Sequence, residues 1–421
     1  MRNPGMSGGI RIISRVSLQN IDSDWLRKAM PVIDPVDLTK KLVRIDSQNP
    51  GPQEEECARF CAGWLRERGF EVEVQTVASG RANLIAKMTG NGSHRPLVFL
   101  AHLDTVPAGD GWSHPPLAGE IHEGRLYGRG STDMKGGLAA AMTAAAQLAE
   151  HRDSLQGDMF VVTTVDEEGR SMLGAKALVK EKKLPPHALT VVPEPTGGRL
   201  RAAHVGAFWL EVVTSGKMAH AGKPWLGADA NHAMAEVIRA IKAAIVDIDT
   251  EHPVLGRPQL TIGRMEGGLQ TNVVPPSCRA EVDIRIVPPL SCDDLKELIR
   301  QAAEGACALV SGTSVTIKAL SVEREPYQTN ENSPLISALM DTYQDVTGNP
   351  LERGGEDGHE AFTDFSVLGP GLQNYDGIVW GLGETNCAHA VDEWMGVDAI
   401  RDTAVILTKV GAKVLGLPVL Q

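Results

Sequence analysis

Along the first two hundred residues, segments with the hydrophobic spacing of helices alternate with short apolar runs typical of strands. Apolar residues three and four positions apart predict helices over 37–44, 54–68 and the Ala-rich 136–150. Short apolar runs bounded by polar or turn residues predict strands, at 71–77, 83–88, 96–100, 158–165 and 188–192. Because strands that alternate with helices are typical of α/β layers, we expect a mixed, largely parallel central sheet flanked by helices.

The order of elements changes after about residue 205. Four strands are now predicted with only two helices among them, in the order 208–214 (strand), 228–245 (helix), 259–264 and 279–287 (strands), 293–309 (helix) and 314–320 (strand). The order β-α-β-β-α-β is that of a ferredoxin-like α+β sandwich. We therefore expect an N-terminal extension (1–30), a discontinuous main domain (31–204 and 321–421) and an inserted ferredoxin-like domain (205–320).

Composition narrows the class of protein. The 421 residues include 41 Lys and Arg against 53 Asp and Glu, a formal net charge of −12, which disfavours nucleic acid and anionic membranes as partners. No apolar run approaches the ~18 residues of a membrane span. Six scattered cysteines in a chain of this length favour free thiols over a disulfide framework. We expect a soluble, cytoplasmic protein that handles small molecules.

Acidic and histidine residues follow several of the predicted strands. His102 and Asp104 end one apolar run, Glu167 and Glu168 end a second, and Glu194 ends a third. Open α/β sheets place their ligands at the carboxyl ends of strands. Adjacent carboxylates such as Glu167 and Glu168 repel each other, and a bound cation would relieve that repulsion.

Two further candidates lie beside glycines. Asp133 follows a Gly-Arg-Gly segment and precedes the helix predicted from Gly136, whose N-terminus favours an anionic group. His389 lies beside Cys387, after a Gly-rich stretch. Singly, each segment also fits a surface ion pair, a helix cap or a solvated acidic turn. Together they supply the imidazoles and carboxylates of a site for two divalent metal ions.

These motifs resemble one family over residues 32–415. It comprises the co-catalytic metal amidohydrolases that include acetylornithine deacetylase, succinyl-diaminopimelate desuccinylase, aminoacylase and carboxypeptidase G. The matching segments are His-Leu-Asp-Thr-Val-Pro (102–107), Gly-Arg-Gly-Ser-Thr-Asp-Met-Lys-Gly-Gly (128–137) and Glu-Glu-Gly (167–169). The resemblance implies that the main domain is a metal-binding catalytic domain and the inserted domain a lid.

The resemblance also implies a role for each candidate. His102, Asp133 and Glu194 would hold one metal ion, and Asp133, Glu168 and His389 the other. Glu167 would be the general base, and Asp104 would orient His102. Zn²⁺ is the first expectation for both ions, with Co²⁺ or Mn²⁺ as alternatives.

Three residues of the inserted domain match family positions near the substrate. His220 resembles a histidine that reaches the neighbouring protomer's site in dimeric relatives, where it would stabilise the oxyanion. Asn272 matches a substrate contact, and Arg285 is suited to bidentate capture of a substrate carboxylate. A surface ion pair is the alternative for Arg285. The resemblance therefore also implies a homodimer paired through the inserted domain.

One segment departs from the family pattern. Many relatives carry Gly-Thr-Asp-x-Arg before the last metal ligand, and that Arg binds the substrate carboxylate. Here the segment reads Gly-Glu-Asp-Gly-His (355–359), with His359 at the Arg position. A histidine is shorter and is half-charged only near pH ~6.5, so the carboxylate contact is altered.

The function implied is metal-dependent cleavage of an N-acyl bond on a small, carboxylated molecule such as an N-acyl amino acid. One alternative is a dipeptidase or carboxypeptidase of the same architecture. Another is a hydrolase of a less usual C–N bond, such as a formamide, carbamate or aryl amine, an alternative that the altered His359 segment leaves open. A non-catalytic binding protein is the alternative outside enzymes, and intact Glu167 together with the five matched metal ligands argues against it.

Overall fold

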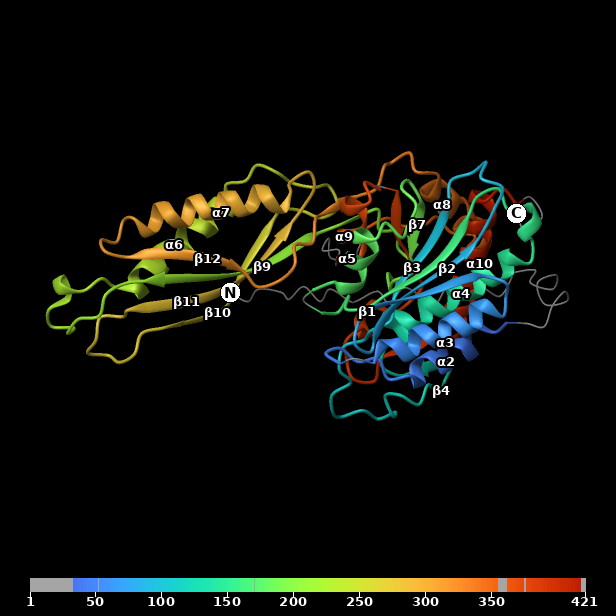
Figure 1. Ribbon diagram of the computed structural model, residues 1–421, viewed down its shortest axis with the longest axis horizontal. Coiled ribbons are helices and arrows are strands. Elements are labelled where there is room, and N and C mark those ends of the chain that lie inside the picture. Colours follow the sequence, from blue (N-terminus) through green and yellow to red (C-terminus); the bar gives the residue numbers. More distant parts are fainter. Residues whose placement is uncertain (1–32, 52, 170, 355–361, 375, 418–421) are drawn as a thin grey trace, which may run out of the picture.

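The computed structural model describes residues 33–51, 53–169, 171–354, 362–374 and 376–417. The predicted N-terminal extension (1–30) lies outside these ranges. Figure 1 shows a larger unit around one sheet and a smaller unit in which helices accompany a second sheet. No helix in the described ranges is long and apolar enough to cross a membrane.

Six strands form the sheet of the larger unit, in the order β1-β2-β6-β3-β7-β14. They are β1 (Glu71–Ala78), β2 (Arg81–Met88), β3 (Leu97–His102), β6 (Met159–Thr164), β7 (Leu189–Val192) and β14 (Gly377–Val379). The last four run parallel, whereas β1 and β2 form an antiparallel edge. Every residue of β3 and β6 is buried, as expected for strands covered on both faces. The predicted mixed, largely parallel sheet is confirmed.

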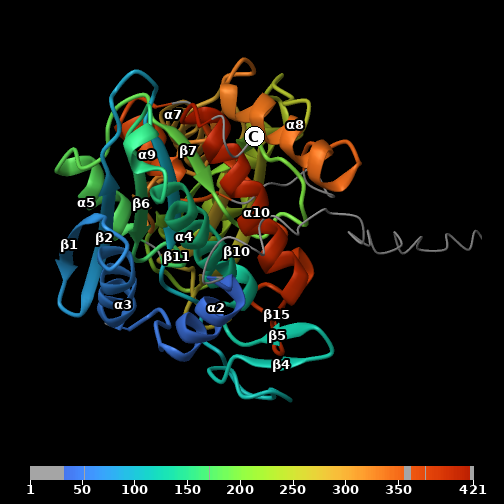
Figure 2. The same cartoon turned by 90° about the vertical axis from the view of Figure 1, so that its right-hand side faces the viewer.

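Helices pack on this sheet and on one another. α3 (Glu54–Arg66) contacts β1 and β2, and α4 (Gly136–Ala149) contacts β3 and β6. α10 (Val397–Val414) packs on α4, and Figure 2 shows the two close together. Every residue of α4 except Gln147 is buried, because this Ala-rich helix is enclosed between the sheet and α10. The remaining helices are α2 (Pro35–Arg44), α5 (Leu173–Lys180), α8 (Pro334–Thr347) and α9 (Phe365–Gly371).

Short ladders join distant parts of the chain in the larger unit. β4 (Glu120–His122) and β5 (Arg125–Tyr127) form a hairpin that β15 (Trp394–Gly396) extends. β8 (Ala203–His204) pairs with β13 (Tyr327–Gln328), one strand on each side of the inserted segment. These ladders bring the late part of the chain against the early part.

The inserted unit has four antiparallel strands and two helices. In chain order they are β9 (Gly206–Ser215), α6 (Ala230–Val246), β10 (Gln259–Gly267), β11 (Ser277–Ile286), α7 (Cys292–Cys307) and β12 (Ser314–Ala319). The sheet order is β10-β11-β9-β12, which is ferredoxin-like. The unit begins and ends within a few residues of the predicted 205 and 320.

A separate hydrophobic core holds the inserted unit together. Apolar side chains of β9 and β11, such as Phe208 and Ile284, pack with Met234 of α6 and Leu295 of α7. β11 alternates buried and partly exposed residues because the helices cover only one of its faces. Both helices begin at a side-chain cap, Asp229 for α6 and Ser291 for α7.

Candidate metal and catalytic site

The candidate ligands meet at the carboxyl edge of the parallel strands. His102 is the last residue of β3, the Glu167–Glu168 pair follows β6, and Glu194 follows β7. Asp133 lies in a tight turn directly before α4. The backbone of Gly137, at the start of α4, packs closely on the strand end, since a Cβ there would lie 1.9 Å from the carbonyl oxygen of Pro193. This contact sets α4 against the segment that carries Glu194.

The side chains form two groups that share one carboxylate. In the first, His102 Nε2 lies 3.2 Å from Asp133 Oδ1 and 3.7 Å from Glu194 Oε1. In the second, His389 Nε2 lies 3.2 Å from Asp133 Oδ2 and 2.9 Å from Glu168 Oε1. Within each group the candidate ligand atoms lie within 4.8 Å of one another. Asp133 therefore presents one oxygen to each group.

The charges of these groups are strongly coupled. Burial, and then the negative charge of Asp133, raise the pKa of Glu194 to about 8. Hydrogen bonds to Asp133 and Glu168 raise the pKa of His389 to about 10. The protonated imidazoles offset only part of the cost of burying these carboxylates, since the pKa of Glu194 stays raised beside His102. Divalent cations fit this donor set, because they would supply the same positive charge to imidazole and carboxylate donors.

His389 reaches the second group from an unusual backbone conformation. Its φ is 62°, in the left-handed region that non-glycine residues rarely adopt. Such a conformation costs about 1–3 kcal/mol and persists where the surroundings require it. Here it turns the imidazole toward Asp133 and Glu168.

Asp104 lies beside His102, as the alternation of a strand predicts, but its carboxylate has another task. The atom hydrogen-bonded to His102 Nδ1 is the backbone carbonyl oxygen of Asp104, at 2.9 Å, while the carboxylate oxygen is 3.8 Å away. The carboxylate accepts the backbone N–H groups of Glu167 (3.2 Å) and Glu168 (3.1 Å). Asp104 thus orients His102 through its main chain and orders the Glu167 turn through its side chain.

A buried polar network extends from this turn. Asn49 Nδ2 donates to Asp104 (2.9 Å) and to Asp166 (3.1 Å), and Arg81 joins Asp166 to the buried Glu54. This network cannot be predicted from the sequence, because its members share no spacing pattern. It joins the segment after β3, which carries Asp104, to the turn after β6, which carries Glu167.

A second buried anchor holds Asp133. The Glu393 carboxylate accepts the N–H groups of Gly130 (3.0 Å), Thr132 (3.0 Å) and Asp133 (3.1 Å). It also pairs with the buried Arg129 at 2.5 Å. Glu393 is not among the residues predicted from the sequence, although it lies four residues after the candidate ligand His389. The same loop thus carries the candidate ligand His389 and the residue that supports the shared candidate ligand Asp133.

Glu167 belongs to neither ligand group, although its neighbour Glu168 does. Its side chain is buried, with 7% of its surface exposed. Burial raises the pKa of Glu167 well above its ordinary value, and the charge of Glu168 adds to the rise. A carboxyl group of this kind is suited to proton transfer beside a metal site.

The residues predicted in the inserted unit do not join this cluster. His220 and Asn272 are exposed, and their loops form the end of the unit remote from the larger one (Figure 1). Arg285 Nε and Nη2 donate to Asp283 at 2.8 and 3.0 Å, which is the ion pair given as its alternative. His359 lies outside the described residues.

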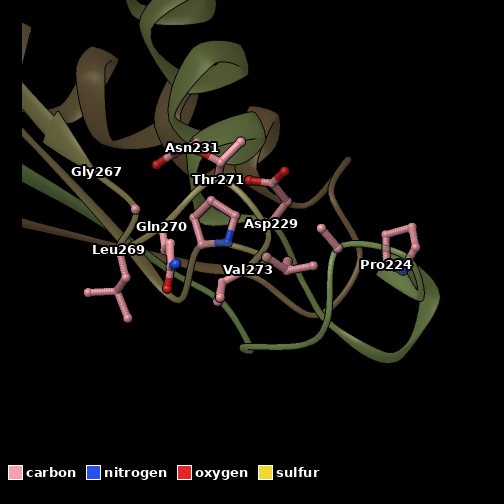
Figure 3. Close-up of a pocket in the computed structure, with 12 residues that line it drawn as sticks. Pro224, Asp229, Asn231, Gly267, Leu269, Gln270, Thr271 and Val273 are labelled. Atoms are coloured by element: carbon pink, nitrogen blue, oxygen red, sulfur yellow. The ribbon is translucent and has the colours of Figure 1, made fainter.

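A cavity of about 560 Å³ lies between the two loops at this remote end (Figure 3). Pro224 borders it on one side, Leu269, Gln270 and Thr271 border it on the other, and Asp229 lies between. The proposed metal ligands do not line this cavity. It is a feature of the inserted unit alone.

Together, the ligand groups at the strand ends and the adjacent acidic turn define a metal-dependent hydrolase of mixed α/β fold. The chain belongs to peptidase family M20/M25/M40, whose model matches residues 98–413. The resemblance stated from the motifs is therefore confirmed, and with it hydrolysis of carbon–nitrogen bonds as the type of reaction.

Individual relatives cover most of the chain. A probable succinyl-diaminopimelate desuccinylase of Staphylococcus epidermidis is 28% identical over 397 residues, which cover 87% of this chain and 94% of that protein. An acetylornithine deacetylase of Vibrio atlanticus is 29% identical over 355 residues, covering 83% and 88%. The crystal structure of an M20 family metallo-carboxypeptidase from Sulfolobus solfataricus has a TM-score of 0.73 at 18% identity, covering 92% of this chain and 100% of that one.

Proposed function

We propose that the protein is a two-metal amidohydrolase that cleaves the N-acyl bond of a small carboxylated substrate, such as an N-acyl amino acid. The observation that carries this proposal is the shared carboxylate, since Asp133 presents one oxygen to each of two ligand groups. The names of the relatives, a desuccinylase and a deacetylase, support N-acyl chemistry.

The two ligand groups would hold one divalent ion each. His102, Asp133 and Glu194 form the first, and Asp133, Glu168 and His389 the second. Zn²⁺ is the first candidate for this donor set, and Co²⁺ or Mn²⁺ would also suit it. When bound, such a pair of ions lowers the pKa of water and polarises the scissile carbonyl.

Glu167 would act as the general base. Its carboxylate takes a proton from the attacking water as the new C–O bond forms, and passes that proton to the amine nitrogen as the C–N bond breaks. A raised pKa suits a group that must accept a proton and release it within one turnover. The hydrogen bonds from the Glu167 and Glu168 N–H groups to Asp104 keep the turn in place during both transfers.

The substrate carboxylate would be bound by Arg285. Asp283 orients the guanidinium through Nε and Nη2, and the side chain keeps 36% of its surface exposed. The planar fork of an arginine suits a carboxylate partner. Asn272 and His359 are proposed as further substrate contacts.

We also propose a homodimer paired through the inserted unit. The loop that carries His220 lies at the end of that unit remote from the larger one (Figure 1), and a second copy could bring it near a ligand cluster, where His220 would act as oxyanion donor. The same end exposes large apolar side chains, which favour burial in an interface: Met218, Trp225, Leu226, Met265 and Leu269. β10 is also an edge strand of its sheet and could pair with a partner.

We also propose that the protein is located in the cytoplasm. All six cysteines are free, which suits a reducing environment.

The test is hydrolysis of a panel of N-acetyl, N-succinyl and N-formyl amino acids, dipeptides and aryl amides. Each is assayed with Zn²⁺, Co²⁺ or Mn²⁺ and with chelator, and Glu167→Gln serves as the inactive control. Metal-dependent turnover of one N-acyl class is the expected result. Turnover of dipeptides alone would replace the proposal by a peptidase, and turnover confined to aryl amides by a hydrolase of less usual C–N bonds.

A further inference from the structure

Arg324 lies where the chain returns from the inserted unit to the larger one. Its N–H donates to the carbonyl oxygen of Ala207 (2.9 Å), and its own carbonyl accepts the N–H of Ala207 (2.8 Å). Gly206 permits this approach, since a Cβ there would lie 2.5 Å from the carbonyl oxygen of Arg324. The two passages of the chain between the units are therefore joined at Arg324.

The side chain of Arg324 leads from this junction to the catalytic turn. Nη2 donates to the carbonyl oxygen of Gly169 at 2.7 Å, directly after the Glu167–Glu168 pair. The ring centroid of Phe362 lies 4.3 Å from the guanidinium carbon. One residue thus links the first strand of the inserted unit to the turn that carries the proposed base and a proposed metal ligand.

Burying the charged guanidinium of Arg324 at this position costs free energy. Arg324 has 0% of its surface exposed. Its Nε and Nη1 have no hydrogen-bond partner in the described part of the chain. Burial lowers the pKa of the guanidinium, and the charges of Glu167 and Asp364 act in the opposite direction. An apolar side chain would avoid the cost of burying this charge, so packing alone does not explain an arginine here.

We propose that Arg324 is a positioning residue for the hydrolytic reaction. It fixes the Glu167–Gly169 turn from the side of the inserted unit, while Asp104 fixes the same turn from the side of the sheet. The turn is thereby held between both units, and the geometry of the base depends on how the inserted unit is seated. This inference rests on the proposed function, because it takes Glu167 as the base.

Arg324→Met and Arg324→Lys test this role in the metal-loaded protein. Methionine fills much of the same volume without the hydrogen bond, and kcat should fall about 10–100-fold while KM changes little. The backbone amides of Glu167 and Glu168 should exchange with deuterium faster. Lysine can still donate to Gly169 and should recover part of both losses. Arg239→Met, which removes an exposed arginine paired with Glu236 on α6, should change neither quantity.

Two results would overturn the inference. One is an Arg324→Met protein that keeps wild-type kcat and amide exchange. The other is a lowered melting temperature with unchanged kcat per folded, metal-loaded chain, which would make Arg324 a packing residue only. If Arg324→Met does not fold, the Lys variant decides by the same two measurements. If the wild-type protein hydrolyses nothing in the panel, the proposed function fails, and amide exchange alone still tests the anchoring.

Discussion

The strand-end site and the remote end of the inserted unit are built in opposite ways. At the strand ends, the groups proposed to act are held by buried partners, as Glu393 holds Asp133. At the remote end, His220 is exposed, and Trp225 and Leu269 keep 74% and 70% of their surfaces exposed. The first region is ordered by contacts within the chain, and the second exposes large apolar side chains. The strand-end site is therefore organised within one chain, whereas we propose that the remote end acts on the site of a second chain.

The largest expected effect tests the strand-end side of this comparison. Glu167→Gln keeps the shape of the side chain and removes the proton acceptor, so kcat should fall about 10²–10⁴-fold. Metal content should stay at the wild-type value, because Glu167 belongs to neither ligand group. Steady-state kinetics with elemental analysis of the same sample measure both. Near-normal kcat would remove Glu167 from its role.

The next effect tests whether the remote end serves another chain. His220→Ala should lower kcat about 10²–10³-fold through loss of an oxyanion donor. Mixing it with Glu167→Gln under conditions that allow subunits to exchange should restore activity. Random pairing makes half of the dimers mixed, each with one complete site, so about a quarter of wild-type activity should return. A strict monomer by light scattering, or no recovery on mixing, would contradict the shared site.

A smaller effect is expected at the buried support of Asp133. Glu393→Gln weakens the acceptor of three N–H groups and leaves Arg129 without its ion pair. Metal affinity should fall about 10–100-fold, as for other groups that orient a ligand. Competition with a chromophoric chelator measures it. Asp398→Asn, at a side chain with 94% of its surface exposed, is the control and should leave the affinity unchanged.

The smallest expected effect is the pH dependence of the melting temperature of the metal-free protein. His389 has its pKa raised to about 10 and Glu194 to about 8, so the folded chain binds protons that the unfolded chain releases. Stability from His389 is fully present below pH ~6.5 and is lost as pH rises toward about 10. The metal-free melting temperature should therefore fall as pH rises through this window. Bound metal should remove most of the dependence, because it displaces these protons. A metal-free melting temperature that rises over the window would contradict the coupled site.

The elements that could be predicted from the sequence are those formed by a continuous or periodic pattern of apolar residues. The strand predicted at 158–165 is β6, because a strand covered on both faces is apolar throughout. β4, β5 and β15 have three residues each, too few to show a period. The strand ends that carry His102 and Glu194 could be anticipated from the rule for open α/β sheets.

The supports of the site could not be predicted in the same way. Glu393 acts by accepting backbone N–H groups, and Arg324 acts on a carbonyl oxygen 155 positions away. Neither contact has a spacing that a sequence pattern reveals. Alternation along a strand brought Asp104 beside His102, but it did not show which atom forms the hydrogen bond.

The loop that carries both His389 and Glu393 also fixes an order of assembly. β14 and this loop follow the inserted unit in the chain, whereas the other strands of the central sheet and the remaining ligands precede it. A growing chain must therefore synthesise the whole inserted unit before its sixth central strand and its last ligand exist. The second ligand group cannot close around an ion until synthesis has passed residue 389. The proposed pair of ions could therefore be held only after both the inserted unit and the loop that follows β14 have been synthesised.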